Sequence, residues 1–295
     1  MKYLLIFIYH LQVISIASAQ DLLPHSAGEI IKHTYYTLSY SEQHEQAFWV
    51  YYKLTTDHIY GSTARSDEFR PDPKVSTTSA QLSDYRDSGY DRGHLCPAGD
   101  MKISPIAMSE SFLMSNISPQ NRSFNGGIWN TLEEKVRSIA KKYNKIDVVT
   151  GPVFKDCMGT IGVNKITIPG YYYKIIYIPI EKPIMIGFLI PNKAEKNNIQ
   201  NYILPVDSIE SLTNIDFFPQ LSLQLQADLE SSVPKEIGNL INTSHNQSYL
   251  ADIPNQSQSG ETNQCLGIAK STGQRCKTKT TNPNGYCNDH QFQAH

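Results

Sequence analysis

The sequence contains a small set of side chains whose types suit the hydrolysis of a phosphodiester bond. His94 lies in a glycine-containing segment two residues after Arg92, and Asn125 and Glu133 follow farther along the chain. A neutral imidazole can take a proton from water near neutral pH. Amide and carboxylate oxygens suit a hard divalent cation, and an arginine fork matches phosphate oxygens. Together these residues predict a metal-assisted phosphodiester hydrolase.

Four ordered blocks resemble one known family over residues 29–230. The blocks are Asp91-Arg-Gly-His94, Asn116-Ile-Ser-Pro-Gln120, Asn125-Gly-Gly-Ile-Trp129 with Leu132-Glu133, and Gly151-Pro-Val-Phe154 with Ile161-Gly-Val-Asn164. They resemble the DNA/RNA non-specific endonuclease family, the ββα-metal group that includes endonuclease G. This resemblance implies an α+β fold of the ββα-metal nuclease type with a central antiparallel sheet. It also implies an endonuclease that hydrolyses DNA and RNA with little sequence selectivity and leaves 5′-phosphate ends.

The same resemblance implies the roles of the main site residues. His94 matches the general base, and Asn125 matches the sole direct protein ligand of a Mg²⁺ (or Mn²⁺) ion that water and phosphate otherwise hold. That coordination fits the reluctance of Mg²⁺ to lose its water. Glu133 matches an acidic residue that acts through the water shell of the metal. On a continuous helix, eight residues would place it about 12 Å beyond Asn125, which also favours a water-mediated role.

The arginines and the supporting residues are assigned in the same way. Arg65 best matches the phosphate-binding arginine of the family, and Arg70 is a competing alignment. Arg92 belongs to the motif at the base and is counted with the catalytic set, although we expect it, like Asn116 and Gln120, to support the site rather than do chemistry.

The residues considered alone leave other interpretations open. Asn125 fits a helix N-cap as well as a metal ligand, and Glu133 fits a solvated charge on a helix. Cys96 and Cys157 fit either a disulfide or two buried thiols, because sequence gives no distance between them.

The pattern of apolar residues predicts which elements hold these side chains. Strands are expected over residues 48–54, 146–150, 171–179 and 184–190, mostly bounded by Gly, Pro or Asn. Apolar spacings of three and four predict a helix over 128–143, and further helices are expected around Asn198 and over 207–215. The first helix also carries basic residues that fit either phosphate contacts or a solvated face, namely Lys135, Arg137, Lys141, Lys142 and Lys145. The combination predicts an α+β domain with an antiparallel sheet.

Composition limits the class of protein before any motif is considered. The chain has 295 residues, of which 18% are charged and 40% hydrophobic, which excludes global disorder. Its net charge of −2 excludes a globally basic nucleic-acid coat, although a local basic face remains compatible with it. Five cysteines cannot all pair with one another, so a pure disulfide scaffold is excluded as well.

Both ends of the chain differ from its middle. Residues 1–19 combine one Lys, a short apolar stretch and Ala17-Ser-Ala19, which predicts a signal peptide and a secreted or periplasmic protein without a membrane span. Residues 231–263 are rich in Asn, Gln and Ser and are predicted to be a polar linker. In the tail, 264–295, four residues fit a structural Zn²⁺, with one disulfide and a free thiol as the alternative. They are Cys265, Cys276, Cys287 and His290.

These features lead to one functional hypothesis and two rivals. We expect an exported, Mg²⁺-dependent nuclease that acts on DNA and RNA. The first rival is a catalytically inactive module that binds nucleic acid without cutting it, and intact His94 and Asn125 argue against it. The second is a secreted nuclease toxin or effector that uses the same chemistry.

Overall fold

A computed structural model describes residues 22–235 together with 263–264 and 279–280. The predicted signal peptide, most of the predicted linker and the four predicted zinc ligands of the tail lie outside the described residues. Within the tail, β12 (Asn263–Gln264) pairs antiparallel with β13 (Lys279–Thr280). The domain boundaries and the zinc site therefore stay predictions from the sequence.

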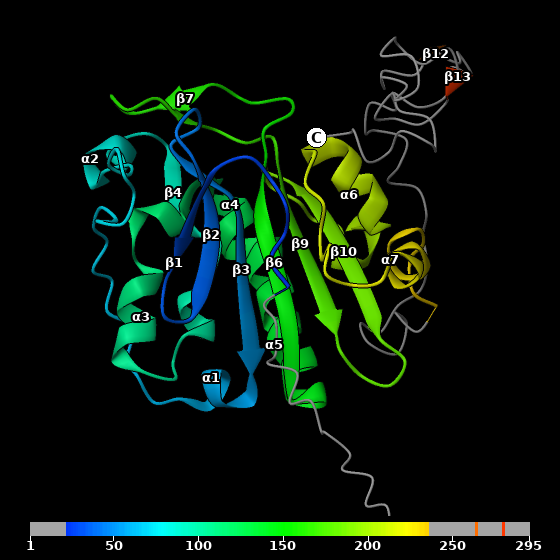
Figure 1. Cartoon of the computed structure of the whole chain (residues 1–295). Coiled ribbons are helices and arrows are strands. Elements are labelled where there is room, and N and C mark those ends of the chain that lie inside the picture. Colours follow the sequence, from blue (N-terminus) through cyan, green and yellow to red (C-terminus); the bar gives the residue numbers. More distant parts are fainter. Residues whose placement is uncertain (1–21, 236–262, 265–278, 281–295) are drawn as a thin grey trace, which may run out of the picture.

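A seven-stranded antiparallel sheet forms the centre of the fold (Figure 1). The strands follow the order β1-β2-β3-β6-β9-β10-β11, and every neighbouring pair is antiparallel. Their bounds are Glu29–Lys32, Tyr36–Ser41, Gln46–Thr55, Lys145–Val153, Tyr171–Ile178, Ile184–Pro191 and Ile203–Leu204. The four strands expected from the sequence correspond to β3, β6, β9 and β10, and the predicted α+β class with a central antiparallel sheet is confirmed.

Each central strand is apolar on both faces because both faces of the sheet are covered. In β3, Trp49 and Tyr51 belong to one core, whereas Val50, Tyr52 and Leu54 belong to the other. Successive side chains of a strand point to opposite faces, so this run supplies both cores at once. Such a strand reads as a nearly continuous apolar segment rather than as an alternating one.

Helices lie on the two faces of this sheet. Figure 1 shows α5 (Asn130–Tyr143) behind β3 and β6, while α6 (Val206–Thr213) and α7 (Leu223–Glu230) lie beside β10. The buried stripe of α5 is Leu132, Val136, Ile139 and Ala140, as its spacing predicts. The helix expected around Asn198 is instead a short 3₁₀ turn, Ile199–Tyr202.

The site-bearing part of the molecule is a two-stranded arm followed by α5. Strand β4 (Tyr90–His94) pairs antiparallel with β5 (Ile117–Asn121) outside the main sheet. The chain then forms α4 (Arg122–Phe124) and a π turn, Asn125–Trp129, before α5 begins. This order, two strands and then a helix, is the ββα unit that the family resemblance implies.

Smaller elements surround this unit. They are α1 (Thr56–Tyr60), α2 (Leu82–Tyr85), α3 (Pro105–Ser111), the 3₁₀ turns Ala98–Asp100 and Met114–Asn116, and the paired strands β7 (Thr160–Ile161) and β8 (Ile166–Thr167).

No helix among the described residues is long and apolar enough to cross a membrane. Cys96 is buried, Cys157 is exposed, and both thiols are free, so neither the disulfide nor the pair of buried thiols is correct.

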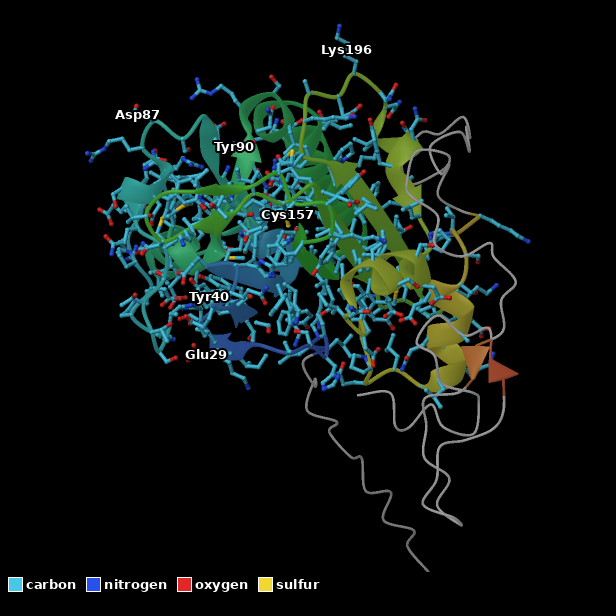
Figure 2. The ribbon with its side chains drawn as sticks, turned by 90° about the horizontal axis from the view of Figure 1, so that it is seen from above. Glu29, Tyr40, Asp87, Tyr90, Cys157 and Lys196 are labelled. Atoms are coloured by element: carbon cyan, nitrogen blue, oxygen red, sulfur yellow. The ribbon has the colours of Figure 1, made fainter. Side chains whose placement is uncertain are left out.

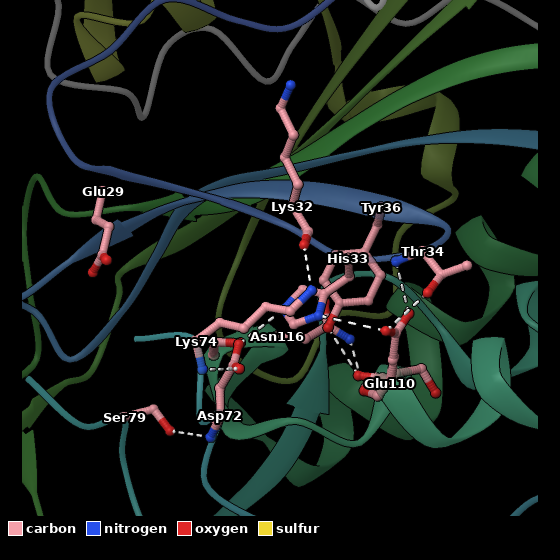
Figure 3. Close-up of polar contacts among 12 residues, drawn as sticks. Glu29, Lys32, His33, Thr34, Tyr36, Asp72, Lys74, Ser79, Glu110 and Asn116 are labelled. Carbon is pink, nitrogen blue, oxygen red and sulfur yellow. Dashed lines mark hydrogen bonds and ion pairs between the residues drawn. The ribbon is translucent and has the colours of Figure 1, made fainter. Parts of the chain in front are cut away.

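A polar network joins the turn between β1 and β2 to Asp72 and to α3 (Figure 3). His33 Nε2 lies 2.9 Å from Asp72 Oδ2, and Ser115 Oγ donates to the same oxygen at 2.5 Å. Thr34 donates to the carboxylate of Glu110 on α3 from both its backbone and its hydroxyl. The strands β1 and β2 are thereby joined to α3 by hydrogen bonds rather than by apolar packing alone.

Asp72 is the acceptor at the centre of this network. Burial by itself would raise the pKa of Asp72, but hydrogen bonds from His33, Ser115 and the backbone of Lys74 outweigh it and lower the pKa below 3.8. A buried acceptor that loses its charge leaves these donors imperfectly paired.

We expect Asp72→Asn to lower the free energy of unfolding at pH 7 by about 3 kcal/mol. Because the folded pKa is depressed, the contribution of the carboxylate is complete above pH 3.8 and is lost as the pH falls through the folded pKa. Urea unfolding at pH 7 and pH 3 should therefore show a smaller gap in acid. The control is Asp87→Asn, an exposed residue at the rim of the molecule (Figure 2), which should stay within about 0.5 kcal/mol of wild type. Equal losses in the two variants would contradict this account.

Candidate active site

His94 ends β4, and its ring packs against a pair of aromatic side chains that also contact each other. The ring centroid lies 5.5 Å from that of Phe69 and 4.9 Å from that of Phe112, the latter edge-to-face. His94 Nε2 is buried and has no hydrogen-bond partner. Burial, followed by the charges of Arg65 and Arg92, lowers the pKa of His94 to about 3. The imidazole is therefore neutral at physiological pH and has an unshared electron pair available for a proton.

The close pairing of β4 with β5 depends on a glycine at position 93. A Cβ atom placed on Gly93 would lie 2.1 Å from Cδ of Gln120, whose side chain is fully buried against it. Gly93 faces Ser118 in the ladder, and His94 faces Ile117. The predicted supporting residue Gln120 thus sets the space beside the base, and only glycine fits that space.

Asn116 fixes the chain just after the base. Its Oδ1 accepts from the backbone nitrogen of Cys96 at 2.8 Å, and its Nδ2 donates to the carbonyls of Cys96 and Ser111. One buried amide therefore connects the end of β4 to the end of α3. Phe112, the ring that contacts His94 edge-on, comes directly after α3.

Asn125 lies inside the helical segment and is not its cap. The N-cap is Asn121, whose Oδ1 accepts from the backbone nitrogens of Ser123 and Phe124. The Nδ2 of Asn125 donates to Asp91 Oδ2 at 3.1 Å, which leaves its amide oxygen as the atom available to a ligand. The geometry therefore favours the metal-ligand interpretation of Asn125 over the N-cap interpretation.

The helix between Asn125 and Glu133 is not continuous. Gly127 has φ −106° and ψ −110°, outside the helical region, within the π turn. An estimate of 12 Å along a straight axis consequently does not apply, and Glu133 and Asn125 line the same cleft. Glu133 is not a freely solvated charge, because burial raises its pKa, with Lys174 opposing that rise and Asp100 adding to it.

Several charged groups lie beneath the cleft and were not singled out by the sequence. Lys174 on β9 is fully buried, and its Nζ lies 4.8 Å from the ring centroid of Trp129. Asp100 accepts from Tyr52 Oη at 2.9 Å and from Arg137 at 3.0 Å. Burial is the main cause that lowers the pKa of Lys174. Lys174, Asp100 and Arg137 together balance positive against negative charge beneath α5, the helix that carries Glu133.

The residues surround two connected clefts. The first has a volume of about 350 Å³ and is lined by His94, Asn125 and Glu133 together with Arg65, Arg92 and Arg137. The second, of about 540 Å³, shares Arg65, Arg92 and Asn125 with the first and adds Arg86, Arg122, Tyr85 and Phe69. Five arginines therefore line the two clefts against three acidic residues, Asp67, Asp91 and Glu133, and this excess of positive charge suits phosphates.

Arg65 and Arg70, the two candidates for the phosphate-binding arginine, have different contacts. Arg65 lines both clefts, with its guanidinium 4.9 Å over the ring of Phe112 and its Nε 2.6 Å from Asp67. Arg70 donates instead to the backbone carbonyl and hydroxyl of Ser109 on α3. Arg65 can therefore reach a phosphate in the cleft, while Arg70 is used to hold α3.

The fold and this site define a ββα nuclease class, in which two strands and a helix present a neutral histidine opposite amide and carboxylate oxygens. The DNA/RNA non-specific endonuclease family matches residues 18–224, and the chain belongs to that family. The family expected from the sequence is thus confirmed.

Three relatives illustrate the similarity. Nuclease EXOG of Danio rerio is 36% identical over 225 residues, covering 70% of this chain and 66% of the relative. Nuclease C1 of Cunninghamella echinulata is 32% identical over 224 residues, covering 70% of this chain and 89% of the relative. A crystal structure of the complex of EndoG with EndoGI superposes with a TM-score of 0.63 and 29% identity, over 67% of this chain and 88% of that one. The match spans only 60% and 59% of the EXOG proteins of Xenopus laevis and Mus musculus.

These comparisons correct the expected location. The EXOG relatives from four vertebrates and human endonuclease G are named as mitochondrial proteins, which contradicts the prediction of a secreted or periplasmic protein. That prediction rested on one lysine, a short apolar stretch and the small residues Ala17-Ser-Ala19 within residues 1–19. Charge and apolar length over so few residues are weak signals of which compartment receives a protein.

Gly93→Ala should test how tightly the ladder beside the base is packed. The added methyl group meets the buried side chain of Gln120, so we expect a loss of about 1–3 kcal/mol in unfolding free energy. A double-mutant cycle with Gln120→Ala should show coupling of about 1 kcal/mol or more, measured by urea denaturation. Gly126→Ala is the matched control, because its Cβ would meet nothing within 4 Å. Strictly additive effects of the pair would show that the two side chains do not compete for space.

Proposed function

We propose that this chain is a Mg²⁺-dependent endonuclease that hydrolyses phosphodiester bonds of DNA and RNA, with His94 as the general base. One observation supports the proposal above the others. His94 Nε2 is buried without a partner at a cleft that Asn125 and Glu133 also line. A buried polar atom without a partner is costly, so a site that retains one is a candidate for chemistry.

Each of the cleft residues has its own role in the proposed reaction. His94 takes a proton from a water molecule, and the resulting hydroxide attacks the phosphorus of a phosphodiester held in the cleft. Arg65 and Arg92 bind the non-bridging phosphate oxygens, because a guanidinium fork matches them and keeps its charge. Departure of the 3′ oxygen of the neighbouring nucleotide leaves the phosphate on the 5′ side. The low pKa of His94 keeps the base unprotonated well below neutral pH.

The residues present fit a divalent metal at this site. Asn125 offers an amide oxygen, a hard ligand, whose orientation is fixed by the hydrogen bond from its Nδ2 to Asp91. Asn125 would hold Mg²⁺ directly, and Glu133 would hold it through water. When bound, the ion supplies charge neutralisation at the phosphate and at the leaving oxygen.

The arginines that line the clefts support a substrate recognised by its backbone. Guanidinium groups contact phosphates, which carry no sequence information, and the same contact is possible with DNA and RNA. Little sequence selectivity follows from such contacts.

His94→Ala should reduce cleavage of plasmid DNA and of RNA by about 10²–10⁴-fold, because the general base is lost while the metal ligands remain. Steady-state cleavage with purified protein, with and without EDTA, measures this. His25→Ala is the matched control, since His25 is exposed and lines neither cleft. Binding of the His94→Ala protein to nucleic acid should persist and should weaken with salt. Near-normal turnover by a folded His94→Ala protein would sink the assignment, and binding without cleavage by the wild type would favour the inactive binding module.

Asn125→Ala should raise the Mg²⁺ concentration required for half-maximal activity, by about 10–100-fold, because the ion loses its direct protein ligand. Glu133→Ala should shift the Mg²⁺ titration less, as its contact is through water. Asn130→Ala is the control, since Asn130 lines the same cleft and its amide is bonded to Glu134. An unchanged Mg²⁺ titration in Asn125→Ala would remove the metal role from this residue.

A further inference from the structure

Three carboxylates gather where α6 meets α7, on the face of the sheet opposite α5. One carboxylate oxygen from each of Asp207, Glu210 and Glu230 lies within 4.8 Å of the others. Asp207 and Glu210 lie three residues apart on α6, and Glu230 is the last residue of α7. Among the described residues, no lysine or arginine forms a salt bridge with any of them.

A second observation concerns the burial of Glu230. Its side chain is only 4% exposed, and its Oε1 has no hydrogen-bond partner. Glu230 is also the one buried residue of α7, whereas Leu223 in the same helix is 84% exposed. A helix that buries an acid in preference to its leucines is not held by apolar packing alone. An unpaired buried carboxylate is costly, so the carboxyl group of Glu230 needs either a proton or a counter-charge.

The local electrostatics agree with that requirement. Burial, together with the negative charges of Glu210, Asp207 and Asp216, raises the pKa of Glu230 to about 8. The pKa of Glu210 is raised to about 7, also chiefly by burial. Carboxylates so close together repel one another, and a cation placed among them would remove both the repulsion and the lack of a partner.

The ligand set and its spacing suit a calcium ion. Ca²⁺ binds carboxylate oxygens at about 2.3–2.6 Å in flexible geometry, and oxygens within 4.8 Å of one another can share one such ion. Mg²⁺ requires near-ideal octahedral geometry and keeps most of its water, which suits three carboxylates from two separate helices less well. We propose that Asp207, Glu210 and Glu230 form a Ca²⁺ site that fastens α7 to α6. Water molecules complete the coordination, and the site is separate from the nuclease cleft.

The experiment is a thermal unfolding titration of the full chain at pH 7.5, first in EDTA and then with increasing CaCl₂. A Ca²⁺ site that exists only in the native state should raise the midpoint temperature of unfolding by about 5 °C at saturating Ca²⁺. Glu230→Gln, which keeps the shape of the side chain, should abolish this Ca²⁺-dependent rise. Asp207→Asn should also reduce it, and because Asp207 is exposed, that variant does not depend on burying a new group.

Two controls separate this site from other effects of calcium. Asp228→Asn removes one charge from the same helix at an exposed position and should retain the full rise. Asn125→Ala should retain it as well, because the rise does not come from the proposed metal position in the cleft. The proposal is overturned if wild type shows no rise, if Glu230→Gln and Asp207→Asn both keep it, or if Asn125→Ala alone removes it.

Discussion

The pairing of β4 with β5 at Gly93 is the contact on which the site depends. It brings two chain segments together so closely that the side chain of Gln120 occupies the space where a Cβ would stand. His94 follows directly and is therefore fixed at the end of a short ladder rather than in a mobile loop. Phe112 and Phe69 then pack against one side of the imidazole, and burial keeps it neutral. The geometry of the base is thus a consequence of backbone packing.

Charge balance beneath the cleft is the second constraint. Glu133 is half-buried on a helix whose other side packs on the sheet, and Lys174, Asp100 and Arg137 compensate one another around it. Replacing one of these groups would leave another buried and unpaired, which is more costly than the absence of both. The arrangement holds Glu133 close to the cleft without exposing it fully to water.

Much of the domain could be predicted from its sequence, because the patterns that reveal it lie within single segments of the chain. The central strands are nearly continuous apolar runs, and α5 shows its buried face by spacing alone. The blocks around His94 and Asn125 are far apart in the sequence, and the structure brings both residues to one cleft, while their catalytic and metal roles stay predictions. Arg65 lines that cleft as well, whereas Arg70 is bonded to Ser109.

Other features could not be predicted because they depend on contacts between distant segments. Lys174 looks like any lysine of a strand, and only the folded sheet buries it against Trp129. The break at Gly127 changes where Glu133 lies, although two adjacent glycines were a visible signal for it. Asp91 stood inside the recognised motif, yet its role as partner of Asn125 and Arg122 requires the turn that follows β5.

The two outer strands of the sheet have a consequence for how the protein behaves in concentrated solution. Strand β1 has four residues and includes a lysine, and β11 has only two. Unpaired backbone groups at the edge of a sheet invite strand addition by another chain, and short or charged edges prevent it. The long apolar strands that build the two cores all lie inside the sheet, where no second molecule can pair with them. The short edge strands therefore protect a large apolar β-sheet from pairing with other molecules.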